Sequence, residues 1–174
     1  HGNVQRMVGI DVDVTAIQQA EEKLQENKHL LEQTALASPD AITIYNLTRK
    51  QPVYLNNCLA EWVGRTNEEL LSMGIEGRLQ LIHPDDRLRM LHFNEKMKEA
   101  KDGELLTVEY RIFGKDEKML WIRSRCKVFQ RDAAGNVTSI LSVLQDVTEA
   151  KASERVLKSL NASLEKKNQE LAVA

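Results

Sequence analysis

Cysteines, long apolar runs and an excess of charge of one sign are all scarce in this sequence. Its two cysteines, Cys58 and Cys126, lie far apart and form no CxxC pair, which disfavours both a disulfide framework and a zinc site. No apolar run approaches the roughly 20 residues of a membrane span, and no signal-peptide pattern opens the chain. We therefore predict a cytoplasmic segment without direct membrane contact, whose parent protein could still carry an anchor elsewhere.

The charges of the chain nearly balance, with 24 Lys plus Arg against 26 Asp plus Glu. This balance lacks the strong positive field that is typical of nucleic-acid-binding proteins. The hydrophobic fraction, 42% of 174 residues, is sufficient for a packed core. The composition therefore predicts one globular domain with appendages and no nucleic-acid partner.

The first residues of the chain resemble a segment near its end. The stretch GNVQRMVGIDVDVT at residues 2–15 returns as GNVTSILSVLQDVT at residues 135–148, at a constant offset of 133 residues. An internal repeat of this kind changes how domains are assigned. We predict that residues 1–15 are the last strand and Asp-Val-Thr turn of a preceding module, so that the chain comes from a longer protein with several such modules.

Each copy of the Asp-Val-Thr turn is followed by a helical pattern, at residues 16–36 and 149–174. Apolar residues in both patterns recur at the alternating three- and four-residue spacing of a coiled-coil seam, in the same phase relative to the turn. A narrow apolar seam needs a partner helix, so we predict a homodimer joined through these helices. The predicted seam residues are Ile17, Ala20, Leu24, Leu31, Leu157, Leu160, Leu164 and Leu171.

Residues 37–148 combine short strand patterns with short helical ones. A longer helix is predicted to begin in the sequence HPDD, because Pro84 suits the first helical turn and Asp85 and Asp86 complement the positive end of the helix dipole. Three strands follow, and the middle one alternates between two faces, with Leu120 and Ile122 on the core side. This pattern predicts one complete α+β domain.

The segment EYRIFGKDEKMLWIRSRCKVFQRDAAGNVTSILSVLQDVT, residues 109–148, resembles the C-terminal three-stranded half, or PAC-type motif, of a PAS domain. LIHPDD at residues 81–86 and PVYLNNCLAEWVGRTNEELLSMG upstream are similar to other parts of the same family. The resemblance covers residues 37–148. It implies a five-stranded antiparallel sheet in the order 2-1-5-4-3 with short helices on one face, flanked by amphipathic coiled-coil helices. The sequence departs from the family at Asp116-Glu117, where Asp-Gly is usual in the hairpin.

The resemblance also implies that the Asp-Val-Thr turn couples the sheet to the following helix. In this sequence the coupling residues would be Asp146 and Thr148, with Asp13 and Thr15 in the upstream copy. The alternative is plain helix capping without a signalling role, since Asp146 and Glu149 have the spacing of a capping box.

A PAS-like core can enclose a small ligand cavity, although the same residues can equally form an ordinary packed core. The predicted lining residues are Ile42, Ile44, Tyr54, Leu59, Trp62, Leu120, Ile122, Ser124 and Ile140. We predict neither haem, which would need His92 as iron ligand, nor flavin, since Cys58 does not lie in the reactive Asn-Cys-Arg-Phe-Leu-Gln motif. No metal site and no catalytic residue are predicted.

The predicted function is that of a sensory or relay module, which passes a conformational change through in-phase dimeric helices to an output domain. The tail SLNASLEKKNQEL resembles the linker before the dimerisation helices of sensor histidine kinases, so the favoured output is a histidine kinase of a two-component system. The segment itself has no phosphoacceptor-histidine context and no nucleotide-binding glycine motif, and is not predicted to be an enzyme. The alternatives are a passive dimerisation or spacer module without ligand, and a diguanylate cyclase as output.

Overall fold

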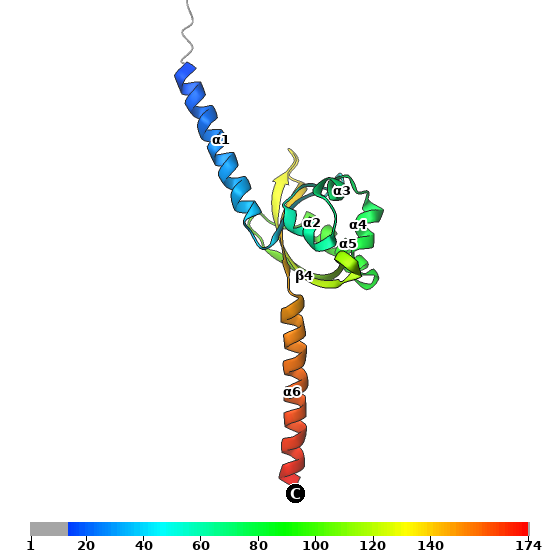
Figure 1. Ribbon diagram of the computed structural model, residues 1–174. Helices are drawn as coiled ribbons and strands as arrows, with labels where there is room; N and C mark the ends of the chain where they lie inside the picture. The colour runs from blue at the N-terminus through cyan, green and yellow to red at the C-terminus, as the bar shows by residue number, and fades with distance from the viewer. Residues whose placement is uncertain (1–13, 174) are drawn as a thin grey trace, which may run out of the picture. The chain divides into compact units, whose positions relative to one another are not determined.

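The computed structural model describes residues 14–173 and divides the chain into two compact units, residues 1–37 and 38–174 (Figure 1). The first unit holds helix α1 (Val14–Leu36), which begins two residues before the predicted start at residue 16. Thr15 therefore lies in the first turn of α1. The predicted upstream strand and Asp13 lie outside the described residues.

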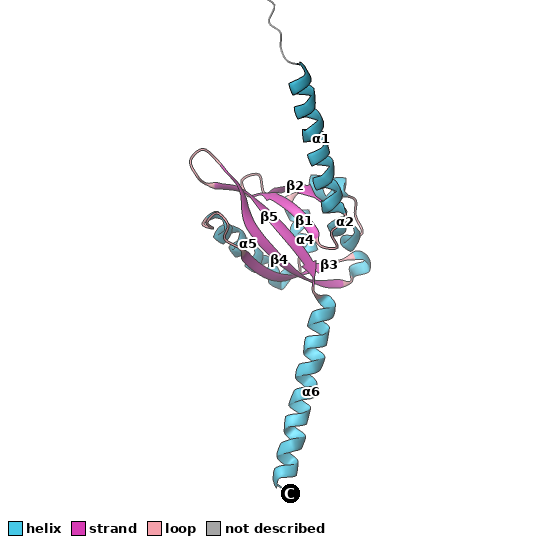
Figure 2. Cartoon of the chain, turned by 90° about the vertical axis from the view of Figure 1, so that its left-hand side faces the viewer, coloured by secondary structure: helices cyan, strands magenta, loops and turns pink. Residues whose placement is uncertain are grey.

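The second unit is built on a five-stranded antiparallel sheet (Figure 2). Its strands are β1 (Ala41–Asn46), β2 (Gln51–Leu55), β3 (Leu106–Phe113), β4 (Met119–Arg131) and β5 (Val137–Asp146). They lie side by side in the order β2-β1-β5-β4-β3. The predicted order 2-1-5-4-3 is thus confirmed.

Four helices connect β2 to β3 and lie together on one face of the sheet (Figures 1 and 2). They are α2 (Asn57–Val63), α3 (Asn67–Ser72), α4 (Ile75–Leu81) and α5 (Pro84–Lys98). The predicted helix start is confirmed, because α5 begins at Pro84 and the side chain of His83 accepts a hydrogen bond from the Asp85 N–H. Helix α6 (Thr148–Val173) follows β5 after one residue.

The register of the strands decides which side chains face the helices. Thr43 of β1 pairs with Ser142 of β5, and Ser142 pairs with Cys126 of β4. Since alternate residues of a strand point to opposite faces, this register places Thr43, Ser142 and Cys126 on the same face of three neighbouring strands. On β4 the buried residues are Leu120, Ile122, Ser124 and Cys126, so the predicted core face of this strand is correct.

The hairpin between β3 and β4 forms despite the unusual Asp116-Glu117 pair. Asp116 and Glu117 both have left-handed backbone angles, with φ of 58° and 57°. The hairpin is closed by a hydrogen bond of 2.7 Å from the Gly114 N–H to the Lys118 carbonyl. Glutamate is strained in this conformation, which glycine adopts freely.

Candidate functional site

The junction between β5 and α6 is bonded directly to Trp121 in the neighbouring strand β4. The Trp121 N–H donates to the hydroxyl oxygen of Thr148 at 2.9 Å, and the Trp121 carbonyl accepts from the Val147 N–H at 2.8 Å. Asp146 completes the turn by accepting hydrogen bonds from both the N–H, at 2.9 Å, and the hydroxyl of Thr148. The first residue of α6 is therefore held by the sheet itself.

The cap of α6 differs from the reciprocal pair predicted between Asp146 and Glu149. The carboxylate of Asp146 binds the N–H of Thr148, two residues further on, and not that of Glu149. The reason is that α6 begins at Thr148, so Asp146 lies one residue too early to act as the N-cap of a capping box. Thr148 consequently has bonds both to its own turn and to β4.

A second contact joins α6 to the outer face of the sheet, through Glu109 of β3. Its carboxylate lies 2.5 Å from the Lys151 ammonium and 2.8 Å from Nε of Arg123. The hydrogen bond from Lys151, and next the one from Arg123, lower the pKa of Glu109 below its ordinary value. Glu109 is thus ionised at neutral pH and links the first turn of α6 to two strands.

Three cations surround the indole ring of Trp121, which points to the same outer face. The Arg111 guanidinium lies 5.4 Å from the ring centroid, the Lys151 ammonium 5.5 Å and the Arg155 guanidinium 5.9 Å. Cation–π attraction of this kind contributes about 0.5–1 kcal/mol at exposed sites. Lys151 and Arg155, one helical turn apart, therefore hold α6 against the ring.

Glu109, Lys151 and Arg155 were not predicted as site residues. The available signal was the four-residue spacing of the two cations just after the Asp-Val-Thr turn, which places them on one helix face. The alternation of side chains along β4 also places their common partner, Trp121, on the outer face of the sheet.

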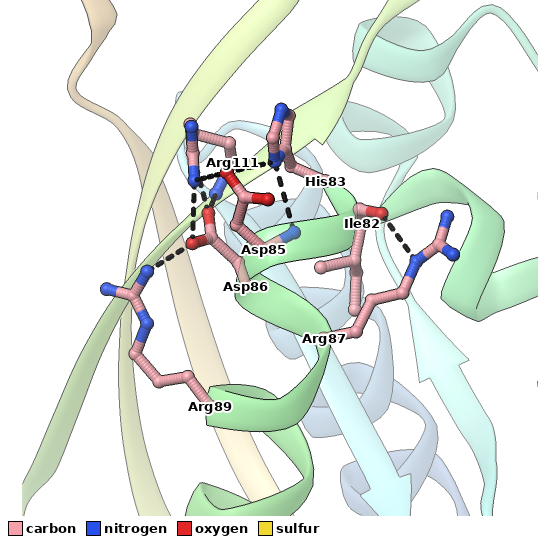
Figure 3. Close-up of polar contacts among 7 residues, drawn as sticks. All are labelled: Ile82, His83, Asp85, Asp86, Arg87, Arg89 and Arg111. Atoms are coloured by element: carbon pink, nitrogen blue, oxygen red, sulfur yellow. Dashed lines mark hydrogen bonds and ion pairs between the residues drawn. The ribbon is translucent and has the colours of Figure 1, made fainter.

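Asp86 anchors the start of α5 to β3 (Figure 3). It is fully buried, and its carboxylate accepts hydrogen bonds from the Arg111 N–H and Nε at 2.8 Å each and from Arg111 Nη2 at 3.0 Å, with Arg89 as a further partner. Asp85 is exposed, and its carboxylate lies 3.3 Å from Arg111. No cluster of metal-ligating side chains occurs within residues 14–173. These carboxylates form ion pairs with arginines.

An apolar cavity of about 170 Å³ lies between the inner face of the sheet and helices α2–α4. Of the predicted lining residues, Leu59 lines this cavity. Leu120, Ile122, Ser124 and Ile140 are buried in the core, and Trp62 packs partly buried against it, but none of these five lines the cavity.

The other three predicted lining residues, Ile42, Ile44 and Tyr54, do not line the cavity. Ile42 pairs with Val143, and Ile44 pairs with Leu141 and Tyr54, so these residues share the outer face. Ala41, Thr43 and Tyr45 occupy the inner face instead. The cause is the pairing with β5, in which Ala41 lies opposite the buried Leu144. Both faces of β1 carry apolar residues, so alternation alone did not distinguish them.

His92 and Cys58, the residues considered for cofactor binding, do not line this cavity. His92 is exposed on α5. The Cys58 thiol donates to the Ser38 carbonyl at 3.2 Å, and burial raises its pKa. Asn56 beside it is buried and binds the Ile42 N–H and the Asp40 carbonyl. The structure thus gives Cys58 a place in the packing around the start of β1.

The predicted seam residues are exposed in the single chain. Ile17, Ala20, Leu24 and Leu31 are exposed on α1, as are Leu157, Leu160 and Leu164 on α6. Leu171 lies in α6, beyond the residues whose side chains the structure describes. Neither α1 nor any other helix in the described part of the chain is long and apolar enough to cross a membrane.

Comparison with known proteins identifies the family that the chain matches. The sequence model of the PAS fold matches residues 52–144. The crystal structure of a sensory box histidine kinase/response regulator from Burkholderia thailandensis is 26% identical, with a TM-score of 0.60, over 77% of this chain and 97% of that one. No curated protein sequence matches.

Two further solved structures share the fold at lower identity. The N-terminal domain of a diguanylate cyclase with PAS/PAC sensor from Marinobacter aquaeolei is 20% identical, with a TM-score of 0.54, over 64% of this chain and 98% of that one. The PAS-B domain of Drosophila melanogaster Cycle with bound ethylene glycol is 14% identical, with a TM-score of 0.51, over 61% and 98%.

Proposed function

Because the chain belongs to the PAS-fold family, we propose that it is a sensory or relay module of a signal-transduction protein. The observation that carries this proposal is the hydrogen bond from the Trp121 N–H to Thr148. It joins the central sheet to the first residue of α6, so a shift of β4 moves the start of the helix. The module has no catalytic role of its own.

The signal is proposed to leave the domain through α6. The helix is fixed to the sheet at three points, the Thr148 bond, the Glu109–Lys151 ion pair and the ring of Trp121. A ligand or an upstream domain shifts this arrangement by favouring one position of α6 over another. Beyond these contacts the apolar residues of α6 are exposed, and we propose that they pair with the same helix of a second chain.

The favoured output is a histidine kinase, and a diguanylate cyclase is the second candidate. A sensory box histidine kinase/response regulator and a diguanylate cyclase both occur among the proteins with this fold. We further propose that residues 1–15, of which residues 2–15 repeat residues 135–148, are the last strand and Asp-Val-Thr turn of a preceding PAS module.

The test uses the parent protein with its output domain. Thr148→Val removes the acceptor of the Trp121 N–H, and Asp146→Ala removes the group that orients Thr148. Both variants are expected to alter the response of the output to its signal while the domain stays folded. Thr138→Val on β5 is the control, because the Thr138 hydroxyl is exposed and bonds to Gln130 within the β4–β5 hairpin. A normal response in both Thr148→Val and Asp146→Ala would contradict the proposal.

A passive spacer is the alternative function. Extraction of the purified protein followed by mass spectrometry separates the two functions, since a spacer retains no small molecule. In a second experiment, a variant whose cavity is filled would signal normally if the domain were a spacer.

A further inference from the structure

Arg111 of β3 uses both of its main-chain groups to hold the start of α5. Its N–H donates to the carboxylate of Asp86 at 2.8 Å, and its carbonyl accepts from the His83 N–H at 2.9 Å. Just before His83, Ile82 forms an isolated antiparallel bridge with Ile112. The segment that enters α5 is therefore bound along the outer edge of β3, at Arg111.

Trp121 of β4 uses the same two groups to hold the start of α6. Its N–H donates to the Thr148 hydroxyl at 2.9 Å, and its carbonyl accepts from the Val147 N–H at 2.8 Å. Arg111 and Trp121 are also direct partners in the register of β3 and β4. Since the main-chain groups of both residues are bonded elsewhere, they form a non-hydrogen-bonded pair, the kind in which opposite side chains lie closest together.

The side chains of this pair meet on the outer face of the sheet. The Arg111 guanidinium lies 5.4 Å from the centroid of the Trp121 ring, which two cations of α6 also approach. The same guanidinium donates from Nε and Nη2 to Asp86, at 2.8 and 3.0 Å, and from Nη2 to Asp85 at 3.3 Å (Figure 3). A single side chain therefore contacts both the start of α5 and the ring that holds α6.

These contacts connect the two faces of the sheet. Helix α5 packs against the buried cores of the inner face through Met90, Phe93 and Met97, whereas α6 contacts the outer face. Asp86 is completely buried and the Arg111 side chain is 21% exposed. Leaving a buried charge unpaired is strongly destabilising, so the guanidinium follows the carboxylate when the start of α5 shifts. Its contact with the ring then changes as well.

We propose that Arg111 is a positioning residue, which transmits the position of the start of α5 to the Trp121 ring and so to the first turns of α6. It gives the output helix an input from the helices on the inner face, in addition to the bond between Trp121 and Thr148. The inference rests on the proposed function only for the use of this coupling in signalling, since the coupling is a property of this chain alone.

The test is a double-mutant cycle of Asp86→Asn and Trp121→Leu. It is read by hydrogen exchange of the Lys151 amide, which donates to the Val147 carbonyl at 2.9 Å. Asp86→Asn removes the charge that holds the guanidinium, and Trp121→Leu removes the ring but keeps the main-chain bonds to α6. We expect Asp86→Asn to speed exchange about twofold to fivefold, the factor that corresponds to a cation–π attraction of about 0.5–1 kcal/mol. In the Trp121→Leu background it should have no such effect.

The NMR signal of the Trp121 indole N–H is the second measurement. It should move in Asp86→Asn, whereas the indole signal of Trp62 in α2 should stay in place. Asp85→Asn gives a milder perturbation, because Asp85 is exposed and also contacts Arg111. It should move the Trp121 signal in the same direction by a smaller amount, which keeps the test valid if Asp86→Asn does not fold.

Glu95→Gln is the control on α5, because Glu95 pairs with Lys98 near the other end of the helix, and it should change neither measurement. Amides of the central strand β5 report unfolding of the whole domain and are measured in the same experiment, so that only the excess at Lys151 counts. The proposal is overturned if Asp86→Asn leaves the Lys151 amide and the Trp121 signal unchanged, or speeds exchange equally with and without the ring. Altered exchange with an unchanged output of the parent protein would instead count against the sensory function alone.

Discussion

The carboxylate of Asp86, at the start of α5, binds both the main chain and the side chain of Arg111 in β3. One oxygen accepts from the Arg111 N–H and Nε at 2.8 Å each, although the two residues are 25 positions apart. Asp86 is completely buried. This contact fixes the long helix to the edge strand of the sheet.

Asp86→Asn is expected to lower the free energy of unfolding at pH 7 by about 2–3 kcal/mol. This loss of stability is smaller than for a fully buried ion pair, because the Arg111 side chain is 21% exposed to solvent. Hydrogen bonds from Arg111 lower the pKa of Asp86 below its ordinary 3.8. The ionised Asp86 carboxylate therefore stabilises the folded state at pH values above the pKa that Asp86 has in the unfolded chain. This stabilisation decreases progressively as the pH falls below about 4.

Urea denaturation of wild type and Asp86→Asn, at pH 7 and at about pH 3, measures this effect, and the difference between the chains should shrink in acid. Asp85→Asn is the matched control on the same helix turn. The Asp85 side chain is 71% exposed, so its loss should change stability by less than about 1 kcal/mol. An Asp86→Asn chain as stable as the control would refute the assigned role.

Glu109→Gln is expected to loosen the first turn of α6 and to cost about 0.5–1 kcal/mol, since the pair with Lys151 is partly exposed. Ion pairing lowers the pKa of Glu109 below its ordinary 4.5. The ion pair thus stabilises the start of α6 above about pH 4.5, and this stabilisation disappears in acid and weakens with salt. Hydrogen exchange of the Lys151 amide, at low and high salt, measures it. Glu165 is exposed farther along α6, so Glu165→Gln is the control and should leave the exchange rate of the Lys151 amide unchanged. An unchanged rate in Glu109→Gln would show that the ion pair has no role.

Glu117→Gly is expected to stabilise the chain by about 0.5–1 kcal/mol. Glu117 has a φ of 57°, a conformation that destabilises a residue with a side chain by about 1–2 kcal/mol. Glycine removes this strain, but its greater conformational freedom in the unfolded chain offsets part of the gain. Thermal unfolding measures the change. Lys118→Gly is the control, because Lys118 has a φ of −63° and glycine there should destabilise. Destabilisation by Glu117→Gly would show that the turn is not strained at this residue.

The sequence sufficed for features that depend on local patterns. Alternation in β4 identified its buried face, and the HPDD pattern identified the start of α5, because both depend on neighbouring residues. The strand order came from the family resemblance. The orientation of β1 was missed because it depends on pairing with β5, about 100 residues away.

The candidate site was predicted in part. The positions of Asp146 and Thr148 followed from the repeated turn, but the partner of Thr148 in β4 did not, since the bond to Trp121 spans 27 residues. The Glu109–Lys151 pair depends on the direction in which α6 leaves the sheet. Of the predicted lining residues only Leu59 was correct, because most of the lining of the cavity comes from α2–α4 and from the opposite face of β1.

We propose that β4 and α6 are coupled through Trp121 and Thr148, and a double-mutant cycle read by hydrogen exchange tests this claim. Ile122→Val removes one methylene from a fully buried residue next to Trp121, which costs about 1 kcal/mol. We expect this change to speed exchange of the Lys151 amide several-fold, and to have no such effect when Thr148 is already replaced by valine. The claim is contradicted if Ile122→Val leaves α6 unchanged or speeds its exchange equally in both backgrounds.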